Sequence, residues 1–291
     1  MDPTRTVVDD ALDQLVHQFS DPLAFLRELV QNAIDAGSTE VAIASTWEAG
    51  VTTIHIDDWG EGMTRAIIET RLTRLFSSTK EGDHTKIGRF GIGFVSVFAL
   101  DPDAVCLDTS REGESWRVLF GRDRSFDLRR LPTAVDGTKI RIIKAMTATG
   151  YAELRAAVPI TVRRWCRHTR CEIRVDGVPI NEPFDLPDAP CRVVARHADL
   201  EVVVGHPRDG TPFFGFYNSG LTLFEGHAAY PAERRFESLA WKASSPQLEH
   251  TLARDKVIED RGHARALARM HELAAGPLAD RAIEMLAVAL A

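Results

Sequence analysis

The stretch DPLAFLRELVQNAIDAG, residues 21–37, predicts a helix with a clear start and a clear end. Asp21 suits the cap that precedes a helix, and Pro22 suits the first helical position. Gly37 suits the exit from the last turn. The rest of the chain can be placed by working outward from this helix.

One face of this helix is polar. Glu28, Asn32 and Asp35 stand at i, i+4 and i+7 and therefore share that face, whereas apolar residues cover the remainder. Amphipathicity alone explains such a stripe. Asparagine, however, is a poor choice for a plain helix surface, because its amide competes with the backbone. Both interpretations stay open from this helix alone.

The segments around the helix predict an α+β fold. A short helix precedes it, and two runs rich in β-branched residues, 41–47 and 51–57, predict a hairpin. Thr64 suits the cap of a further helix that reaches about Phe76. Additional strands are expected at residues 104–109, 115–120, 126–131 and 137–143. Helices grouped against consecutive strands favour a two-layer α/β sandwich over a doubly wound fold.

A second, smaller α+β domain is expected, with residues 1–148 forming the first domain and residues 149–291 the second. It begins with a helix that is interrupted or started at Pro159. A helical pattern broken at Gly276-Pro277 follows its strands. Those strands are expected at residues 171–177, 191–196, 201–205 and 213–224.

Composition is that of an ordinary globular protein. Of the 291 residues, 44% are hydrophobic and 26% charged, which argues against disorder. No leader and no apolar run of the roughly 20 residues that a membrane span needs is found, so we expect a cytoplasmic protein. The net charge of -7 argues against whole-surface attraction to nucleic acid. The four cysteines lack zinc-ligand spacing and are expected to be reduced, mostly core thiols: Cys106, Cys166, Cys171 and Cys191.

The stretch DDWGEGM, residues 57–63, places a carboxylate at the end of a predicted strand. Asp58 there can accept a hydrogen bond from an amino group. Gly60 and Gly62 allow a ligand to approach the backbone closely. A tight acidic turn between strand and helix has the same composition, and the motif alone does not separate the two interpretations.

The stretch IGRFGIGF, residues 87–94, places Gly88, Gly91 and Gly93 just before an apolar helix. Glycine amides that lead into a helix N-terminus form an anion site. A plain glycine-rich loop is the alternative. A dinucleotide fingerprint is excluded by context, because the polar stretch at residues 77–86 precedes it where a strand would be required.

These three motifs, in one order and together with DGTKIRI at residues 136–142, resemble the four nucleotide-binding motifs of the GHKL ATPase superfamily. Gyrase, the heat-shock protein 90 chaperones, histidine kinases and MutL are members. FLRELVQNAIDA is most similar to the heat-shock protein 90 branch, and the match spans residues 21–143. The resemblance implies the Bergerat ATP-binding fold, ATPase activity, and ATP and Mg²⁺ as cofactors.

The resemblance also implies roles for individual residues. Glu28 would position or activate the attacking water, Asn32 would coordinate Mg²⁺, and Asp58 would accept from the adenine amino group. Thr138 would support that end through water, and Lys80, in the lid-like stretch 77–86, would reach a phosphate. The implied ATP-binding set is Asn32, Asp35, Asp58, Gly60, Gly62, Met63, Lys80, Gly88, Phe90, Gly91, Ile92, Gly93, Phe94 and Thr138.

The second segment resembles, more loosely, the middle or transducer domain of the same chaperones. Arg254 in LEHTLARDKVIED stands where the family places an arginine that reaches the terminal phosphate, and a salt-bridge arginine is the alternative. The chain departs from the chaperones at Ser77 and Arg71 in the lid region. Arg27, beside Glu28, is expected either to pair with it at rest or to lie exposed.

Two functions remain from the sequence. The first is an ATPase whose lid closure drives a conformational change in a protein client or partner, with an ATP-dependent dimer as a further expectation. The alternative is a nucleic-acid-linked clamp similar to MutL, MORC or type IIB topoisomerase B subunits, with RRWCRHTR at residues 163–170 as a contact surface. A histidine kinase is disfavoured, and a nucleotide sensor that does not hydrolyse ATP stays open. No membrane partner is expected.

Overall fold

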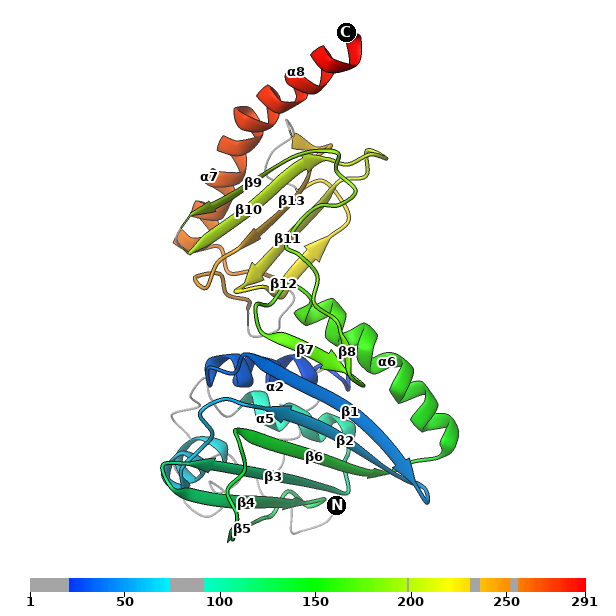
Figure 1. Ribbon diagram of the computed structural model, residues 1–291, viewed down its shortest axis with the longest axis vertical. Helices are drawn as coiled ribbons and strands as arrows, with labels where there is room; N and C mark the ends of the chain where they lie inside the picture. Colours follow the sequence, from blue (N-terminus) through cyan, green and yellow to red (C-terminus); the bar gives the residue numbers. More distant parts are fainter. Residues whose placement is uncertain (1–20, 74–91, 198, 231–235, 252–255) are drawn as a thin grey trace, which may run out of the picture. The chain divides into compact units, whose positions relative to one another are not determined.

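The computed structural model describes residues 21–73, 92–197, 199–230, 236–251 and 256–291 (Figure 1). The chain divides into two compact units. The N-terminal unit comprises residues up to 164 together with 171–180, and the C-terminal unit comprises 165–170 and 181–291. The division differs from the expected boundary after residue 148, because a helix and two strands beyond that point belong to the N-terminal unit. The predicted α+β class is confirmed.

The N-terminal unit is built on a sheet that has eight strands within the described residues, in the order β5-β4-β3-β6-β2-β1-β7-β8. Neighbouring strands are antiparallel, except that β7 pairs parallel with β1. The β1–β2 hairpin turns at Ala49 and Gly50, both with positive φ, as the sequence predicts. The strands are β1 (Glu40–Glu48), β2 (Val51–Asp58), β3 (Ala104–Arg111), β4 (Glu114–Gly121), β5 (Phe126–Arg130), β6 (Thr138–Ala145), β7 (Glu172–Val175) and β8 (Val178–Pro179).

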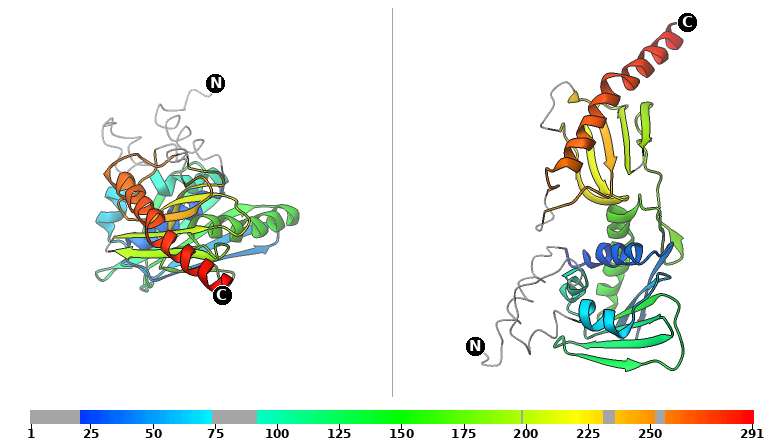
Figure 2. Two further views of the ribbon diagram at one scale, coloured as in Figure 1. Left: turned by 90° about the horizontal axis from the view of Figure 1, so that it is seen from above. Right: turned by 90° about the vertical axis from the view of Figure 1, so that its left-hand side faces the viewer.

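Short helices cover one face of this sheet (Figure 2). The Asp21 carboxylate accepts from the Leu23 amide at 2.8 Å and so caps the turn before the first described helix, which begins at Phe25. Thr64 caps the next helix as predicted, accepting from the Ile67 amide. The elements are α2 (Phe25–Asp35), α3 (Arg65–Ile67), π-helix η1 (Ile68–Leu72), α5 (Ile92–Val95) and 3₁₀-helix η2 (Ser96–Leu100). The expected short N-terminal helix lies outside the described residues.

The expected break at Pro159 is wrong. Helix α6 (Ala148–Cys166) runs through this proline without interruption. Proline removes one backbone hydrogen bond from a helix interior. The burial of Leu154, Val158 and Val162 on one side of α6 holds the flanking turns in place and offsets that loss.

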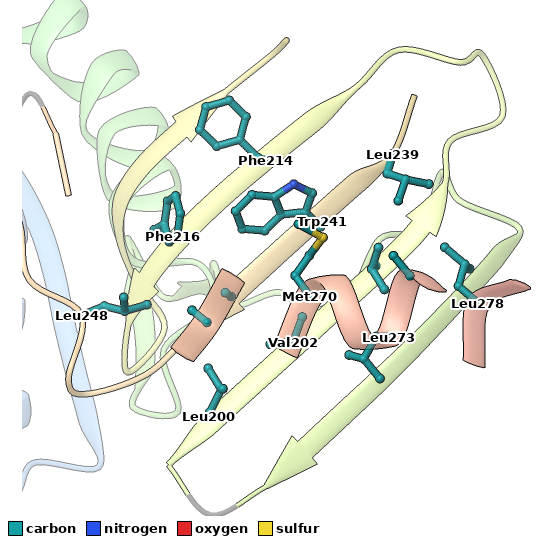
Figure 3. Close-up of a cluster of buried hydrophobic side chains, with 14 of the residues drawn as sticks. Leu200, Val202, Phe214, Phe216, Leu239, Trp241, Leu248, Met270, Leu273 and Leu278 are labelled. Carbon is teal, nitrogen blue, oxygen red and sulfur yellow. The ribbon is translucent and has the colours of Figure 1, made fainter. Parts of the chain in front are cut away.

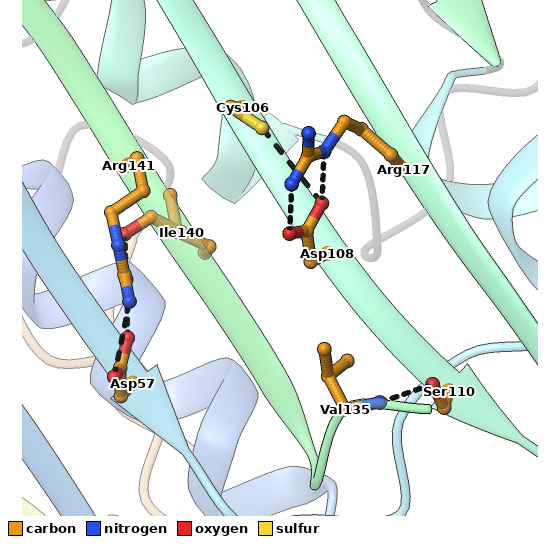
Figure 4. A network of polar contacts seen from close by, with 8 residues as sticks. All are labelled: Asp57, Cys106, Asp108, Ser110, Arg117, Val135, Ile140 and Arg141. Carbon is orange, nitrogen blue, oxygen red and sulfur yellow. Dashed lines mark hydrogen bonds and ion pairs between the residues drawn. The ribbon is translucent and has the colours of Figure 1, made fainter. Parts of the chain in front are cut away.

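The other face of the sheet carries polar side chains that pair across strands (Figure 4). Arg117 of β4 makes two hydrogen bonds of 2.6 Å with Asp108 of β3, and Arg141 of β6 pairs with Asp57 of β2. Alternating burial along each strand places these residues opposite the apolar residues that face the helices. The inner face is therefore the one that can hold a buried site.

In the part of the C-terminal unit that the structure describes, five strands form a sheet in the order β12-β11-β13-β10-β9. Helices α7 and α8 pack on it around Trp241, which is surrounded by Phe214, Phe216 and Met270 (Figure 3). The sequence missed β13, whereas the predicted break at Gly276-Pro277 separates the two helices. The elements are β9 (Cys191–His197), β10 (Leu200–His206), β11 (Phe213–Asn218), β12 (Leu221–Gly226), β13 (Ala240–Ser244), α7 (Arg261–Ala275) and α8 (Pro277–Leu290).

All four cysteines are free thiols, and Cys166, Cys171 and Cys191 are buried, as predicted. Burial raises the pKa of Cys171 to about 11 and so keeps its thiol protonated. Within the described residues, no helix is long and apolar enough to cross a membrane.

Candidate functional site

The predicted polar face of α2 is present, and its members differ in exposure. Glu28 is 9% exposed, whereas Asn32 and Asp35 are exposed one and two turns later. Arg27 Nη1 donates to Glu28 Oε1 at 2.7 Å, so the expected resting ion pair forms. Arg27 is buried, at 6% exposure, and the alternative of an exposed helix arginine is wrong.

The end of the glycine-rich motif lies against Glu28. A Cβ added at Gly93 would stand 3.1 Å from Glu28 Oε2, so a glycine is what allows the carboxylate to approach this backbone. Phe94, a member of the implied ATP-binding set, is buried and packs on Phe98 and Phe120 in the core. The first and third motifs therefore meet at Glu28.

The second motif also meets α2. Asp58 ends β2, and the Gly60 amide donates to Asp58 Oδ1 at 2.9 Å. The Glu61 amide donates to the carbonyl of Ala36 at the end of α2, at 2.8 Å. A Cβ at Gly60 would stand 2.7 Å from that same oxygen, which requires glycine there.

Burial raises the pKa of the Asp58 carboxyl above its ordinary value. Hydrogen bonds from the amides of Gly60 and Thr138, and the charge of Lys139, act in the opposite direction. Lys139 also donates to the Asp58 carbonyl at 3.2 Å and lies 3.9 Å from the ring centre of Trp59. A half-buried carboxylate held in this way can accept a hydrogen bond from a ligand amino group.

Thr109 is a buried residue that sequence reasoning missed. The Met63 amide donates to its hydroxyl at 2.9 Å, and Thr109 Oγ1 lies 3.2 Å from both the Gly137 carbonyl oxygen and the Thr138 hydroxyl. These groups meet at the Thr109 hydroxyl. Thr109 stands at an inward position of β3, where strand alternation calls for an apolar residue, and that was the signal available in the sequence.

The glycines of these turns pack closely. A Cβ at Gly62, whose φ is 68°, would stand 2.2 Å from the Ser110 carbonyl oxygen. Ser38, a second residue that sequence reasoning missed, accepts from the Trp59 amide at 2.9 Å. The turn after Asp58 is thus fixed from both sides.

Several predicted site residues lie outside the described residues: Lys80, Gly88, Phe90, Gly91 and Arg254. Ile92 begins α5, and its backbone is described. Asp35 accepts from the Gln31 side chain at 2.9 Å. Within the described ranges, no group of three histidine, cysteine or acidic residues is placed to hold a metal ion. The expected Mg²⁺ contact of Asn32 stays a prediction.

The basic run at residues 163–170 folds partly inward. Arg167 and His168 belong to the C-terminal unit and join Tyr217, Glu225 and Lys242 in what we call the charge network. Lys242 Nζ lies 2.9 Å from His168 Nε2, and Arg167 Nε donates to that same nitrogen at 3.2 Å. Arg167 also pairs with Glu225, which accepts from the Tyr217 hydroxyl at 2.6 Å.

The charge network perturbs the groups within it. Burial, followed by the charges of Lys242 and Arg167, lowers the pKa of His168 to about 4. Burial, followed by the charge of Arg167, lowers the pKa of Lys242 to about 8. His168 Nδ1 lies 3.2 Å from the Glu182 carbonyl oxygen, so the neutral ring donates there and accepts at Nε2.

Comparison with known proteins supports the expected resemblance of the N-terminal unit. Residues 23–123 match the family described as histidine kinase-, DNA gyrase B- and HSP90-like ATPase. Chaperone protein HtpG of Magnetococcus marinus is 32% identical over 170 residues, covering 47% of this chain and 26% of the relative. HtpG of Aromatoleum aromaticum is 30% identical over 171 residues, covering 46% and 26%. HtpG of Pseudoalteromonas translucida is 33% identical over 139 residues, covering 38% and 22%.

The predicted resemblance to the GHKL superfamily, and within it to the heat-shock protein 90 type, is confirmed for this part of the chain. The chain spans about a quarter of the length of these curated relatives.

Proposed function

We propose, from the premise that residues 23–123 form an ATPase domain of the GHKL family, that this chain binds ATP with Mg²⁺ and hydrolyses it. The observation that carries the proposal is the meeting of the motifs. Gly93 packs on Glu28, Gly60 packs on the end of α2, and Asp58 pairs with Thr138 across β2 and β6. Residues that are separate in sequence therefore surround one region of the N-terminal unit.

Each part of the nucleotide has a matching group in this proposal. Asp58 accepts from the adenine amino group, and Thr138 supports the same end. Asn32, exposed on the face that carries Glu28, offers an amide oxygen to Mg²⁺, which commonly binds through few protein ligands together with phosphates. Mg²⁺ neutralises phosphate charge when bound. The phosphate contacts are assigned, by the resemblance, to the glycine-rich motif that ends at Gly93.

Glu28 is proposed to orient the attacking water and to accept its proton. Phosphoryl transfer needs positioning and charge stabilisation rather than a covalent nucleophile, so one well-placed carboxylate suffices. The 2.7 Å contact between Arg27 and Glu28 occupies one of the two carboxylate oxygens. Opening of this ion pair would release that oxygen for the water.

The coupling of hydrolysis to a client or partner is proposed from the resemblance to the heat-shock protein 90 chaperones. Lid closure over residues 77–86 and contact of Arg254 with the terminal phosphate would couple hydrolysis to a client or partner, in an ATP-dependent dimer. Arg254→Ala should slow hydrolysis and leave ADP affinity unchanged, because ADP lacks that phosphate. Normal turnover, or an equal loss of ADP binding, would remove this role. The cytoplasmic location stays a prediction.

The nucleic-acid clamp receives little support. Arg167 and His168, two residues of the expected contact surface, are held in the charge network of the C-terminal unit. DNA binding that weakens steeply with salt would revive this alternative.

The proposal is tested by calorimetry of ATP binding in the presence of Mg²⁺. Asp58→Asn replaces an acceptor with an amide whose N–H₂ cannot accept, so binding should be abolished. Asp57→Asn is the matched control, because Asp57 is the preceding residue and pairs with Arg141 on the opposite face of the sheet. Undiminished binding by the Asp58 variant would remove the pocket assignment.

A further inference from the structure

Helix α8 carries an apolar surface that the described residues leave uncovered. Within this helix, Leu278 is buried, and Ala282 and Met285 are partly buried against the same core. Figures 1 and 2 show the C-terminal turns of α8 continuing past the strands of its own unit's sheet. Four large apolar side chains of α8 keep between 62% and 87% of their surface exposed: Ile283, Leu286, Val288 and Leu290.

Spacing along α8 places most of these residues in one narrow stripe, which we call the α8 seam. Its exposed members follow one another at intervals of four, three and four residues: Ala279, Ile283, Leu286 and Leu290. Val288 lies outside the seam, as do Arg281 and Glu284, which pair with each other at 3.3 Å. A stripe this narrow is typical of a helix that packs against one other helix, whereas a globular core covers a wider face.

The α8 seam is complementary to itself when two copies of the helix run in opposite directions. About a two-fold axis in the middle of the seam, Ile283 of each copy faces Leu286 of the other. Leu290 of each copy then faces Ala279 of the other, so a large side chain lies opposite a small one. A parallel pair would instead set leucine against leucine at one end and leave a gap between two alanines at the other. No charged residue belongs to the seam, so two seams meet without like charges facing each other.

We infer that the α8 seam is a self-association surface, at which a second copy of this chain docks through its own α8 in an antiparallel pair. The inference uses no residue of the nucleotide site, and the pair forms without ATP. Two helices of 14 residues bury less than the roughly 1,600 Å² of a standard interface. Association should therefore be weak, with half of the chains paired at a concentration on the order of 10 µM.

Sedimentation velocity of the full chain without nucleotide, over a range of concentrations, measures this association. Leu286→Glu places a carboxylate in the seam and should weaken pairing at least about tenfold, because a charge buried without a partner is costly. Val288→Glu is the matched control. Val288 is more exposed than Leu286, at 79% against 62%, but lies outside the seam, so pairing should stay within about twofold of the wild type. Urea unfolding checks that both variants fold.

A pair of cysteine substitutions tests the direction of the helices. With Ala279→Cys and Leu290→Cys in one chain, an antiparallel pair sets each new thiol opposite the other new thiol of the second copy, so mild oxidation should give a covalent dimer. Either substitution alone should give little, because its two copies then lie about 16 Å apart along the helix axis. The unsubstituted chain, with its four free cysteines, is the control.

Four results would overturn the inference. A chain that stays monomeric at every concentration would leave the seam to another protein or to another segment. Equal weakening by Leu286→Glu and Val288→Glu would indicate nonspecific association of exposed apolar side chains. Efficient crosslinking of either single cysteine variant would show a parallel pair. Association that appears only with ATP would be the dimer of the proposed function, whereas failure of ATP binding leaves this inference untouched.

Discussion

The two units each bury polar side chains, and they use them in opposite ways. The N-terminal unit gathers Glu28, Asp58, Thr109 and Thr138, a set that we call the nucleotide face. Amides support the carboxylate of Asp58, an arginine pairs with that of Glu28, and the two threonine hydroxyls bond to each other. The charge network of the C-terminal unit instead joins an arginine, a carboxylate, a tyrosine, a histidine and a lysine directly to one another.

The difference separates a site from a structural element. In the charge network, the His168 ring uses Nδ1 and Nε2 within the protein, and Glu225 accepts from two side chains. On the nucleotide face, desolvation raises the pKa of the half-buried Asp58 carboxyl above its ordinary value. Burial of polar groups alone does not indicate a binding site. A binding site is indicated by polar groups that keep hydrogen-bonding capacity for a ligand.

The comparison predicts a large stability loss when the charge network is broken. Glu225→Leu leaves Arg167 and the Tyr217 hydroxyl without this acceptor, and should lower the free energy of unfolding by about 3 to 5 kcal/mol. The surface control Arg196→Gln breaks an exposed pair with Glu201 and should cost less than about 1 kcal/mol. Urea unfolding measures the free energy of unfolding of both variants. Hydrogen exchange of residues 213–226 then reports on the strands that carry Tyr217 and Glu225.

ATP affinity should remain unchanged in the Glu225 variant as long as the protein is folded. Loss of ATP affinity at unchanged stability would contradict the structural assignment of the charge network.

The charge network also predicts a dependence on pH. In the folded protein the His168 ring becomes protonated only near pH 4. In the unfolded chain it becomes protonated near pH 6.5. The contribution of His168 to the free energy of unfolding is therefore complete above pH 6.5. It falls as the pH drops toward 4, by about 3 kcal/mol in all. Lys242, with a folded pKa of about 8, adds stability as pH rises from 8 toward 10.5.

The measurement for this prediction is the unfolding free energy of the wild type and of His168→Gln across pH 4 to 7. The variant lacks the titrating ring, so its curve should be flatter in this window. Parallel curves would show that other groups cause the acid sensitivity.

On the nucleotide face, Glu28→Ala should lower ATP hydrolysis roughly 10²-fold or more, the usual scale for losing a general base, while ATP affinity is retained. Gln31→Ala, on the same helix, is the control and should keep normal turnover. Phosphate release and calorimetry measure the two quantities separately. Wild-type turnover in the Glu28 variant would assign this residue to an ordinary polar stripe.

The smallest effect is expected at Gly93. Gly93→Ala places a methyl group 3.1 Å from Glu28 Oε2, so the carboxylate must shift by a few tenths of an ångström. Hydrolysis should fall about tenfold, since misplacement of a catalytic group is costly, with little change in thermal stability. A fall in stability with unchanged turnover would show that Gly93 matters for packing rather than for Glu28.

Much of the fold was predictable because its signals are local. The caps, the Ala49-Gly50 turn and the alternation of the strands depend on neighbouring residues. The expectation failed at Pro159, where tertiary packing along α6 outweighs a local preference, and at β13, which pairs with β10 and β11 from a distant part of the chain. The unit boundary moved because β7 joins the first sheet beside β1.

The sequence by itself determined the chemical groups of the candidate site and the elements that carry them, since motif spacing and periodicity are encoded over a few residues. Only the tertiary structure decided which of these groups meet. Thr109 reaches Met63 across 46 residues, and Lys242 reaches His168 across 74. Such contacts depend on strand register and burial, which no local pattern specifies. For that reason a threonine hidden in a strand joined the candidate site, and a basic run became a buried network.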